Sequence, residues 1–389
     1  MPRVSRHPRL CIATGRYLRA GETFVTRHVA ELCGGNTVVV CGRRAAPDPL
    51  GRPVFSRLAA AANPADIAAA PWHIWRNLAR HDAPFVPFGR HARALEAFLR
   101  REGVEVMLAE FGSQAVSLWP VAKALGLPLF SYFRGRDASK YLENPRRLAG
   151  YRRMMPQLAG IFAVSGFLLD NLAARGLNHA NAHVVPSGVD TQAFRPGAKE
   201  PGLMLAVGRM VEKKAPQVTI AAFAQAAARH PAARLEFIGH GPLLRACRAQ
   251  AAAAGLAGRV VFHGRQPHAF VRARLAAADI FVQHSVTGRD GETEGMPTAI
   301  QEAMAAGAAI LSTRHAGIPG TVSEGETGHL VHEFDRDGFA RAMDALLADP
   351  ARTRAMGAAA RHVAETRLEY RRVYQQVEAV LAAALEAPR

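Results

Sequence analysis

An acidic stretch ahead of an Ala-rich segment is the part of the sequence best suited to holding hydroxyl groups. It reads DGETEGMPTAIQEAMAAG over residues 290–307. Thr298 and Gln301 have the spacing of a capping box, which predicts a helix that starts at Thr298. Glu294 would then precede the helix, and Glu302 would lie in its first turn or just past it. Because a carboxylate accepts two hydrogen bonds, each acid could hold a pair of sugar or ribose hydroxyls.

The same element also offers backbone groups to an anion. Gly295 permits close approach of a ligand to the backbone, and free N–H groups near a helix start attract phosphate. One short element therefore predicts an acid for sugar hydroxyls, amides for phosphate and a second acid for ribose. The alternative is a helix with ordinary surface acids.

A second stretch, VGRMVEKKAP at 207–216, places positive charge directly after a predicted strand. Gly208 lets the backbone turn, and Arg209 and Lys214 follow five residues apart. Arg can bind two phosphate oxygens at once, and Lys supplies a compact charge. Phosphates are bound at the carboxyl edge of parallel sheets, where this stretch would lie. The alternative is a solvated basic turn.

Short apolar runs alternate with helical patterns along both halves of the chain. The predicted strands are 9–15, 37–42, 104–112, 127–133, 161–165 and 182–188 in the first half, and 203–208, 234–239, 259–264, 279–285, 308–313 and 327–331 in the second. Continuous apolar strands separated by helices are typical of parallel sheets covered on both faces. The predicted fold class is α/β, with two doubly wound Rossmann-like domains facing each other across a cleft that would hold the ligand.

The domain boundaries are predicted from composition. Residues 190–202 contain two Pro, two Gly and several charges, and we interpret them as a linker because the strand–helix alternation restarts after them. The predicted domains are 1–190 and 203–350, followed by a helical tail at 351–389 that packs back toward the N-terminal domain. Residues 43–90, rich in Ala, Pro and Trp, are predicted to form an irregular insertion or a helical lid.

Charge is distributed unevenly along the 389 residues, whose net charge is +17. Residues 1–160 contain 24 Lys and Arg against 11 Asp and Glu, whereas the remainder contains 25 against 21. A basic first half could meet nucleic acid, an anionic membrane face or a phosphorylated substrate. Compositional bias is the alternative, because 44 of the 49 basic residues are Arg. The start of the chain is interpreted as a basic lead into a strand, and four cysteines without CxxC spacing predict buried thiols in a reducing cytosol.

The two charged stretches together resemble the C-terminal half of the retaining family 4 glycosyltransferases, which have the GT-B fold. That family carries a G-R-x4-K stretch and an E-x7-E element, and Gly208-Arg209 with Lys214 and Glu294 with Glu302 match them in order and separation. Segments that also resemble the family lie at 185–196, 237–244, 263–285 and 317–331. Residues 21–32 and 108–112 resemble the subgroup that builds bacterial exopolysaccharides and colanic-acid-like polymers. The resemblance covers most of residues 9–370.

This resemblance implies a retaining glycosyltransferase that works without a metal or cofactor. Arg209 and Lys214 would neutralise the diphosphate of a nucleotide-sugar donor as it leaves, and Glu294 would hold hydroxyls of the transferred sugar. The remaining donor-binding residues that it implies are Gly208, Gly295, Met296, Pro297, Thr298 and Glu302, the last of them at the ribose.

The acceptor side is implied at YFRGRDASK, residues 132–140. Gly135 and Asp137 match an H-G-x-D element of the family, but Arg134 stands where His is usual, and Arg cannot act as a base. Glu22 and Thr23 are the other residues expected on this side. The acceptor would be a glycan or a polyprenyl-diphosphate-linked sugar, and the protein would be cytoplasmic, with peripheral contact to the anionic inner face of the cell membrane.

Arg134 leaves open a second class of function, a catalytically weak nucleotide-sugar-binding protein of the same fold. An epimerase of this fold would need a pair of acid/base groups, and the sequence offers no convincing pair. A dinucleotide dehydrogenase has little support, because Gly239-x-Gly241 lacks the third glycine of that fingerprint. Nucleic acid is not an expected partner, because charge alone supports it and no recognisable module is present.

Overall fold

The computed structural model describes residues 7–19, 22–44, 46–58 and 64–386, which form two compact units. Unit 1 comprises Met1–Val164, Leu168–Val185 and Tyr374–Arg389, and unit 2 comprises Ser165–Phe167 and Pro186–Val373. The segment 190–202, interpreted above as a linker, packs with unit 2. Gly21 and the basic lead through residue 6 lie outside the described residues.

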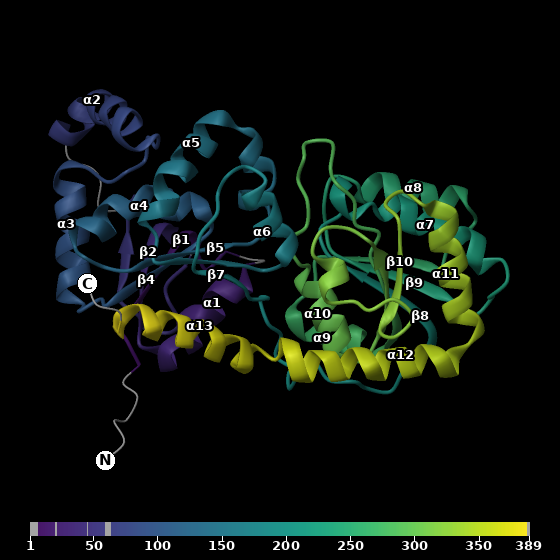
Figure 1. Cartoon of the computed structure of the whole chain (residues 1–389). Helices are drawn as coiled ribbons and strands as arrows, with labels where there is room; N and C mark the ends of the chain where they lie inside the picture. Colours follow the sequence, from purple (N-terminus) through teal and green to yellow (C-terminus); the bar gives the residue numbers. More distant parts are fainter. Residues whose placement is uncertain (1–6, 20–21, 45, 59–63, 387–389) are drawn as a thin grey trace, which may run out of the picture. The chain divides into compact units, whose positions relative to one another are not determined.

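Unit 1 is built on a seven-stranded parallel sheet with the order β3-β2-β1-β4-β5-β6-β7 (Figure 1). The strands are β1 (Leu10–Tyr17), β2 (Thr37–Arg44), β3 (Val54–Ser56), β4 (Val106–Glu110), β5 (Leu129–Phe133), β6 (Gly160–Ala163) and β7 (Ala182–Val184). The helices are α1 (Thr23–Glu31), α2 (Pro64–His81), α3 (Gly89–Arg101), α4 (Gly112–Ala124), α5 (Pro145–Met154) and α6 (Gly166–Ala173). The central strands are buried along their whole length because helices cover both faces of a parallel sheet.

The segment at 43–90 contains β3, α2 and the beginning of α3. The prediction of an irregular insertion is therefore wrong, and the prediction of a helical segment is confirmed. The helix α2 continues for 18 residues although Pro71 lies inside it. Buried Asn77 fastens α2 to the following loop, since its Nδ2 donates to the carbonyl oxygen of Val86 at 2.9 Å. At the other end of α2, the carboxylate of Asp66 accepts the backbone N–H of Arg90 at 3.2 Å.

Unit 2 is built on a six-stranded parallel sheet with the order β10-β9-β8-β11-β12-β13 (Figure 1). Its strands are β8 (Glu200–Val207), β9 (Arg234–Ile238), β10 (Val260–Gly264), β11 (Ala278–Val282), β12 (Ala309–Thr313) and β13 (Gly328–Val331). Its helices are α7 (Pro216–Ala227), α8 (Leu244–Ala253), α9 (His268–Ala277), α10 (Thr298–Ala305), α11 (Arg336–Ala348) and α12 (Pro350–Val363). All twelve strands predicted from the sequence are therefore present.

The helical tail has a π-helical turn at Ala364–Leu368, and the boundary between the units falls after Val373, in the first turn of the last helix. The helix α12 packs with unit 2, and the last helix, α13 (Tyr370–Glu386), runs beside α1 of unit 1 (Figure 1). There, the Glu378 carboxylate accepts the backbone N–H of Cys33 at 2.7 Å, and the rings of Tyr374 and His28 meet edge to face with centroids 5.0 Å apart.

One further sequence-based expectation concerns the cysteines. The four cysteine residues are buried, as predicted, and their thiols are not joined in disulfides. Within the described ranges, every helix is too short or too polar to cross a lipid bilayer.

Candidate functional site

Three neighbouring strands of unit 2 bring the predicted cationic stretch to one edge of the sheet. β8 pairs with β11, and β11 pairs with β12, all in parallel, so their carboxyl ends meet at the same edge. The loops that follow these strands carry Lys214, Gln283 and His315 respectively. Ligands of doubly wound sheets bind at this edge, which makes it the candidate site of unit 2.

Lys214 and Glu294 form a buried ion pair at this edge. The Nζ atom of Lys214 donates to Oε1 of Gln283 at 2.8 Å and lies 3.1 Å from Oε1 of Glu294. Burial lowers the pKa of Lys214, and Glu294 partly opposes that shift. Burial by itself would raise the pKa of Glu294, but Lys214 and Lys213 outweigh it, so the pKa is lowered. The lysines therefore favour the charged form of the Glu294 carboxylate, and Glu294 in turn favours the charged form of Lys214.

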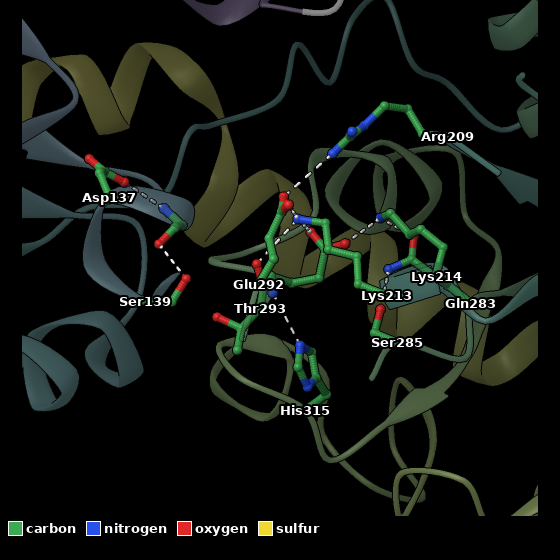
Figure 2. Close-up of polar contacts among 12 residues, drawn as sticks. Asp137, Ser139, Arg209, Lys213, Lys214, Gln283, Ser285, Glu292, Thr293 and His315 are labelled. Carbon is green, nitrogen blue, oxygen red and sulfur yellow. Dashed lines mark hydrogen bonds and ion pairs between the residues drawn. The ribbon is translucent and has the colours of Figure 1, made fainter. Parts of the chain in front are cut away.

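Lys213 and Arg209 add two more positive charges to the loop that contains Glu294. Nζ of Lys213 lies 2.9 Å from Oε1 of Glu292 and 3.8 Å from Oε2 of Glu294. The guanidinium of Arg209, whose side chain is 67% exposed, lies 3.7 Å from the same Glu292 oxygen. Figure 2 shows Arg209 and Lys213 directed toward Glu292 and Lys214 beside Gln283. Three cations face two carboxylates, so this cation cluster (Arg209, Lys213 and Lys214) has charge left over for an anion.

His315 fixes the acidic loop to the sheet. Its Nε2 accepts the backbone N–H of Glu294 at 3.1 Å, so the ring proton resides on Nδ1, which donates to Oε1 of Glu333 at 2.6 Å. The backbone of Gly317 lies against the same loop, because its N–H donates to the carbonyl oxygen of Gly295 at 3.1 Å. A Cβ at Gly317 would come within 2.1 Å of that oxygen, so only glycine fits.

The helix α10 starts at Thr298, as the sequence predicts, but the predicted capping box between Thr298 and Gln301 does not form. Pro297 is the N-cap residue, and no side chain caps the helix. Thr298 is exposed, whereas Gln301 is fully buried, and neither polar atom of its amide has a hydrogen-bond partner among the described residues. The Gln301 side chain therefore points into unit 2 and cannot reach back to the helix start. Glu302 lies half-buried one turn into α10.

Arg134 of unit 1 is enclosed by two aromatic rings and a carboxylate. Its Nε donates to Oε2 of Glu110 at 2.7 Å, and its guanidinium carbon lies 3.8 Å and 4.0 Å from the ring centroids of Tyr132 and Phe24. The other oxygen of Glu110 meets Nδ1 of His28 at 2.5 Å. Burial opposes ionisation of Glu110, but Arg134 and His28 lower its pKa to about 2. The Arg134 side chain is only 6% exposed, and its place beside a sugar stays a prediction.

Asp137 organises the turn that follows β5. Its carboxylate accepts three backbone N–H groups, those of Arg134 at 3.0 Å, Gly135 at 3.1 Å and Gly112 at 3.0 Å. Gly112 is the first residue of α4, so the bond ties the turn to that helix. The Ser139 hydroxyl completes the turn by donating to the carbonyl oxygen of Gly135 at 3.0 Å (Figure 2). Burial raises the pKa of Asp137, and these backbone bonds counter that rise.

Glu22 and Thr23 lie at the start of α1, next to the Arg134 cluster. Glu22 precedes the helix, and its Oε1 accepts a hydrogen bond from Nη1 of Arg19 at 2.8 Å. Burial raises the pKa of Glu22. Thr23 is exposed, and Phe24, the next residue, contacts Arg134.

The structure brings some of the predicted residues together in one site and shows that other residues belong to the same site. Gly208, Arg209, Lys214 and Glu294 lie in one network, and Gly295, Met296 and Pro297 continue the Glu294 loop into α10. The sequence analysis missed four contributors, which are Lys213, Gln283, Glu292 and His315. The position of Gln283 and His315 directly after predicted strands was the available signal. In the described part of the chain, no group of His, Cys, Asp and Glu side chains could hold a metal ion.

Solved structures define the class of fold. HepE from Anabaena in complex with UDP superimposes with a TM-score of 0.76 at 15% identity, covering 96% of this chain and 100% of HepE. Sucrose-phosphate synthase from Thermosynechococcus elongatus gives a TM-score of 0.74 at 19% identity, covering 98% and 100%. Identities this low show the fold alone, and that fold is GT-B, with two Rossmann-like domains as predicted.

Family models identify the chain more closely. The model of Glycosyltransferase Family 4 matches residues 22–193, and the model of Glycosyl transferases group 1 matches residues 189–363. The chain therefore belongs to the glycosyltransferases of group 1 and family 4, which confirms the resemblance found in the sequence.

Curated relatives match over part of their length. WcaL of Salmonella typhimurium, a glycosyltransferase whose name assigns it to colanic acid biosynthesis, is 32% identical over 243 residues, which are 61% of this chain and 60% of WcaL. A GDP-mannose-dependent phosphatidylinositol monomannoside mannosyltransferase of Mycolicibacterium smegmatis is 33% identical over 51% of this chain and 55% of the relative. The amylovoran biosynthesis glycosyltransferase AmsK of Erwinia amylovora is 28% identical over 64% and 62%. The chain thus spans about 60% of the length of the curated relatives it matches.

Proposed function

We propose that this protein is a retaining, metal-independent glycosyltransferase that moves a sugar from a nucleoside-diphosphate sugar to a glycan or lipid-linked acceptor in cell-surface polysaccharide biosynthesis. Unit 2 binds the donor, and unit 1 binds the acceptor. The observation that carries the proposal is the cation cluster at the carboxyl edge of unit 2, next to the Glu294 loop. The names of the relatives support it, since they include exopolysaccharide enzymes and a GDP-mannose-dependent one.

In this proposal, the cation cluster acts on the leaving group. The bond between the anomeric carbon and the phosphate oxygen breaks, and the acceptor oxygen forms the new bond on the same face of the sugar. The acceptor's proton passes to the departing phosphate oxygen. Negative charge grows on the diphosphate as it leaves, and Arg209, Lys213 and Lys214 are already positioned to stabilise it. Preorganised charge of this kind contributes about 3–4 kcal/mol per group.

Glu294 and Glu302 have separate tasks in the proposal. Glu294 holds hydroxyls of the transferred sugar, while the ion pair with Lys214 keeps its carboxylate charged. Glu302 on α10 binds the ribose of the nucleotide. Glu294→Ala should therefore damage transfer more than nucleotide binding, and Glu302→Ala should do the reverse. Equal, small effects of both substitutions would remove these assignments.

The decisive test is a panel of UDP-, GDP- and other nucleoside-diphosphate sugars, offered together with a polyprenyl-diphosphate-linked sugar as acceptor. Released nucleoside diphosphate reports turnover, and NMR of the product reports the anomeric configuration. The proposal expects turnover with at least one donor and a product with retained configuration. An inverted product, or a requirement for an added divalent metal, would contradict it.

A second candidate is a catalytically weak nucleotide-sugar-binding protein of the same fold. The observation that favours it is Arg134, which stands at the usual His position and is committed to Glu110 inside unit 1. This candidate predicts that nucleotide sugars bind to the protein but release no nucleoside diphosphate. The same panel, read by thermal shift alongside product release, separates the two functions.

We propose further that the protein works in the cytoplasm, at the inner face of the cell membrane. The excess of basic residues in residues 1–160 supports this location, because anionic lipids attract Arg. Co-sedimentation with anionic and with neutral vesicles tests it. Equal binding to both kinds of vesicle would leave compositional bias as the explanation of the charge.

A further inference from the structure

Unit 1 contains a cavity of about 910 Å³ that none of the sequence motifs predicts. At one side it is lined by Gly15 and Gly42, near the carboxyl ends of β1 and β2, and by Ser113 and Gln114 in the first turn of α4. The cavity thus begins at the sheet edge where doubly wound domains bind their ligands. From there it extends to the helix α2.

The α2 side of the cavity is apolar. Ile67, Ala70, Ile74 and Leu78 line it at the three- and four-residue spacing of one helix face. The loop that Asn77 fastens to α2 supplies further apolar lining, which comprises Ala83, Pro84, Phe85, Val86, Pro87 and Phe88. An apolar wall of this size that faces water is unfavourable unless an apolar group covers it.

The mouth of the cavity is apolar as well. Leu58, Ile67 and Phe85, which all line it, are 61%, 62% and 74% exposed. Exposed apolar side chains around a cavity mark a binding site for an apolar ligand. The outward residue Trp75, 65% exposed on the same helix, does not line the cavity.

Three arginines give the cavity a basic rim. Arg57 donates to the carbonyl oxygen of Phe85 at 2.6 Å and to Oγ of Ser117 at 3.1 Å, and no carboxylate pairs with it among the described residues. Burial lowers the pKa of Arg57, because the surroundings of its guanidinium oppose the charged form. Arg146 and Arg147, in the first turn of α5, are the other two cations.

Acidic residues of the lining do not cancel this charge. Asp82 pairs with Arg153, which does not line the cavity. Asp66 accepts the backbone N–H of Arg90 and keeps its negative charge, so it offsets only one of the three arginines. Burial lowers the pKa of His91, so this ring is neutral near neutral pH. An anion with several oxygens can therefore bind these arginines, which have no ion pair among the described residues, because each guanidinium can donate to two oxygens.

We propose that this cavity is a lipid-phosphate site, in which a hydrocarbon chain packs against α2 and a phosphate or diphosphate meets Arg57, Arg146 and Arg147. The occupant is a single amphiphilic molecule rather than a bilayer, because the apolar face of α2 lines the cavity. The inference rests on the proposed function, since it assigns the lipid part of the acceptor to a place in unit 1.

The test measures binding of farnesyl diphosphate to the full chain by calorimetry, with inorganic diphosphate and farnesol as separate probes. Farnesyl diphosphate is expected to bind at least about tenfold more tightly than either probe, because only it uses both ends of the site. Ile74→Asp and Arg57→Gln should each weaken its binding by about tenfold or more. Equal affinity for farnesyl diphosphate and inorganic diphosphate would overturn the proposal.

Two controls and one further variant keep the test specific. Trp75→Ala on the outer face of α2 and Arg100→Gln on α3 should leave farnesyl diphosphate binding unchanged, since neither residue lines the cavity. Ala70→Trp should block farnesyl diphosphate binding by filling the cavity. This variant tests the cavity proposal if Ile74→Asp fails to fold. If Trp75→Ala weakens binding as much as Ile74→Asp, the ligand lies on the outer face, and the cavity proposal is wrong.

Titration of the same protein with UDP and GDP separates this inference from the proposed function. Binding of a nucleoside diphosphate without binding of farnesyl diphosphate would overturn the lipid site and leave the transferase in place. Binding of farnesyl diphosphate without either nucleotide would contradict the transferase and leave the lipid site in place.

Discussion

Each unit holds a buried cation–carboxylate pair near the carboxyl edge of a parallel sheet. The two pairs differ in the net charge that remains once each cation is matched with a carboxylate. In unit 1, Arg134 lies between two rings and pairs with Glu110, whose second oxygen is occupied by His28. Burial lowers the pKa of His28, so the positive and negative charges balance. In unit 2, three cations share Glu292 and Glu294, and Arg209 is mostly exposed.

This difference distinguishes a charge pair that is balanced within the fold from a cluster that has charge left over for an anion. A balanced pair that is shielded from water has no net charge left over, and the role of Arg134 at the acceptor side stays a prediction. A cluster with one extra cation, part of which is exposed to water, attracts an anion. Its cations keep their carboxylate partners when the anion leaves. The same chemical groups therefore have different tasks because their counter-charges and their access to water differ.

The largest expected effect is on stability, in unit 1. Glu110→Ala would leave Arg134 buried without a counter-charge and should lower the free energy of unfolding by about 3–5 kcal/mol. Urea-induced unfolding measures this change. Glu96→Ala is the control, because Glu96 pairs with Arg100 on the surface of α3 and should cost about 0.5 kcal/mol or less. A loss as small as the control's would mean that water reaches the Arg134 guanidinium.

Next in size is an effect on turnover, in unit 2. Lys214→Ala should lower the turnover number by about 100- to 1,000-fold, because it removes a preorganised charge from the leaving diphosphate. Nucleoside diphosphate release measures it. Arg229→Ala is the control, since Arg229 pairs with Asp344 on the surface, beyond the end of α7. Wild-type turnover in a folded Lys214→Ala protein would reject the role of this lysine.

Arg209 sharpens the comparison, because it should affect turnover without affecting stability. Arg209→Ala is expected to lower turnover by about 100-fold. Since the side chain is mostly exposed, the free energy of unfolding should change by about 0.5 kcal/mol or less. Turnover and urea unfolding of the same preparation test both statements. A variant that loses stability in step with activity would place Arg209 among the structural charges.

The smallest expected effect is a pH dependence of nucleotide binding. Burial lowers the pKa of Lys214 below its usual 10.5, so this cation is lost earlier than an ordinary lysine as pH rises. Affinity for a nucleoside diphosphate should therefore fall on the alkaline side before ordinary lysines titrate. Lys214→Arg, which stays protonated, should keep its affinity there. Identical pH profiles for the two proteins would show that Lys214 does not supply the charge.

The sequence predicts the sheets well because the signal for a buried parallel strand is local. A run such as the first four residues of β4, 106–109, is apolar over its whole length, and a helical pattern follows the strand. Segment 43–90 was predicted less well, since β3 has only three residues and Pro71 lies within α2. The cavity beside α2 could not be predicted, because segments distant in the sequence line it.

The site was predicted in part, and the missing part has one physical cause. Arg209, Lys214 and Glu294 were found because they lie in spaced patterns within short stretches. The contacts of Lys214 with Gln283 and of Glu294 with His315 join residues 69 and 21 positions apart, which no local pattern records. The burial of Arg134 against Glu110, 24 residues earlier, is of the same kind.

The most direct test of the central claim is calorimetric titration with UDP and GDP, compared with uridine and guanosine. If the cation cluster of unit 2 is arranged for a leaving diphosphate, at least one diphosphate should bind far more tightly than its nucleoside. The double variant Lys213→Ala/Lys214→Ala should then lose about 100-fold in affinity for that diphosphate. Equal affinity for nucleoside and diphosphate, or unchanged diphosphate binding in the folded double variant, would contradict the claim.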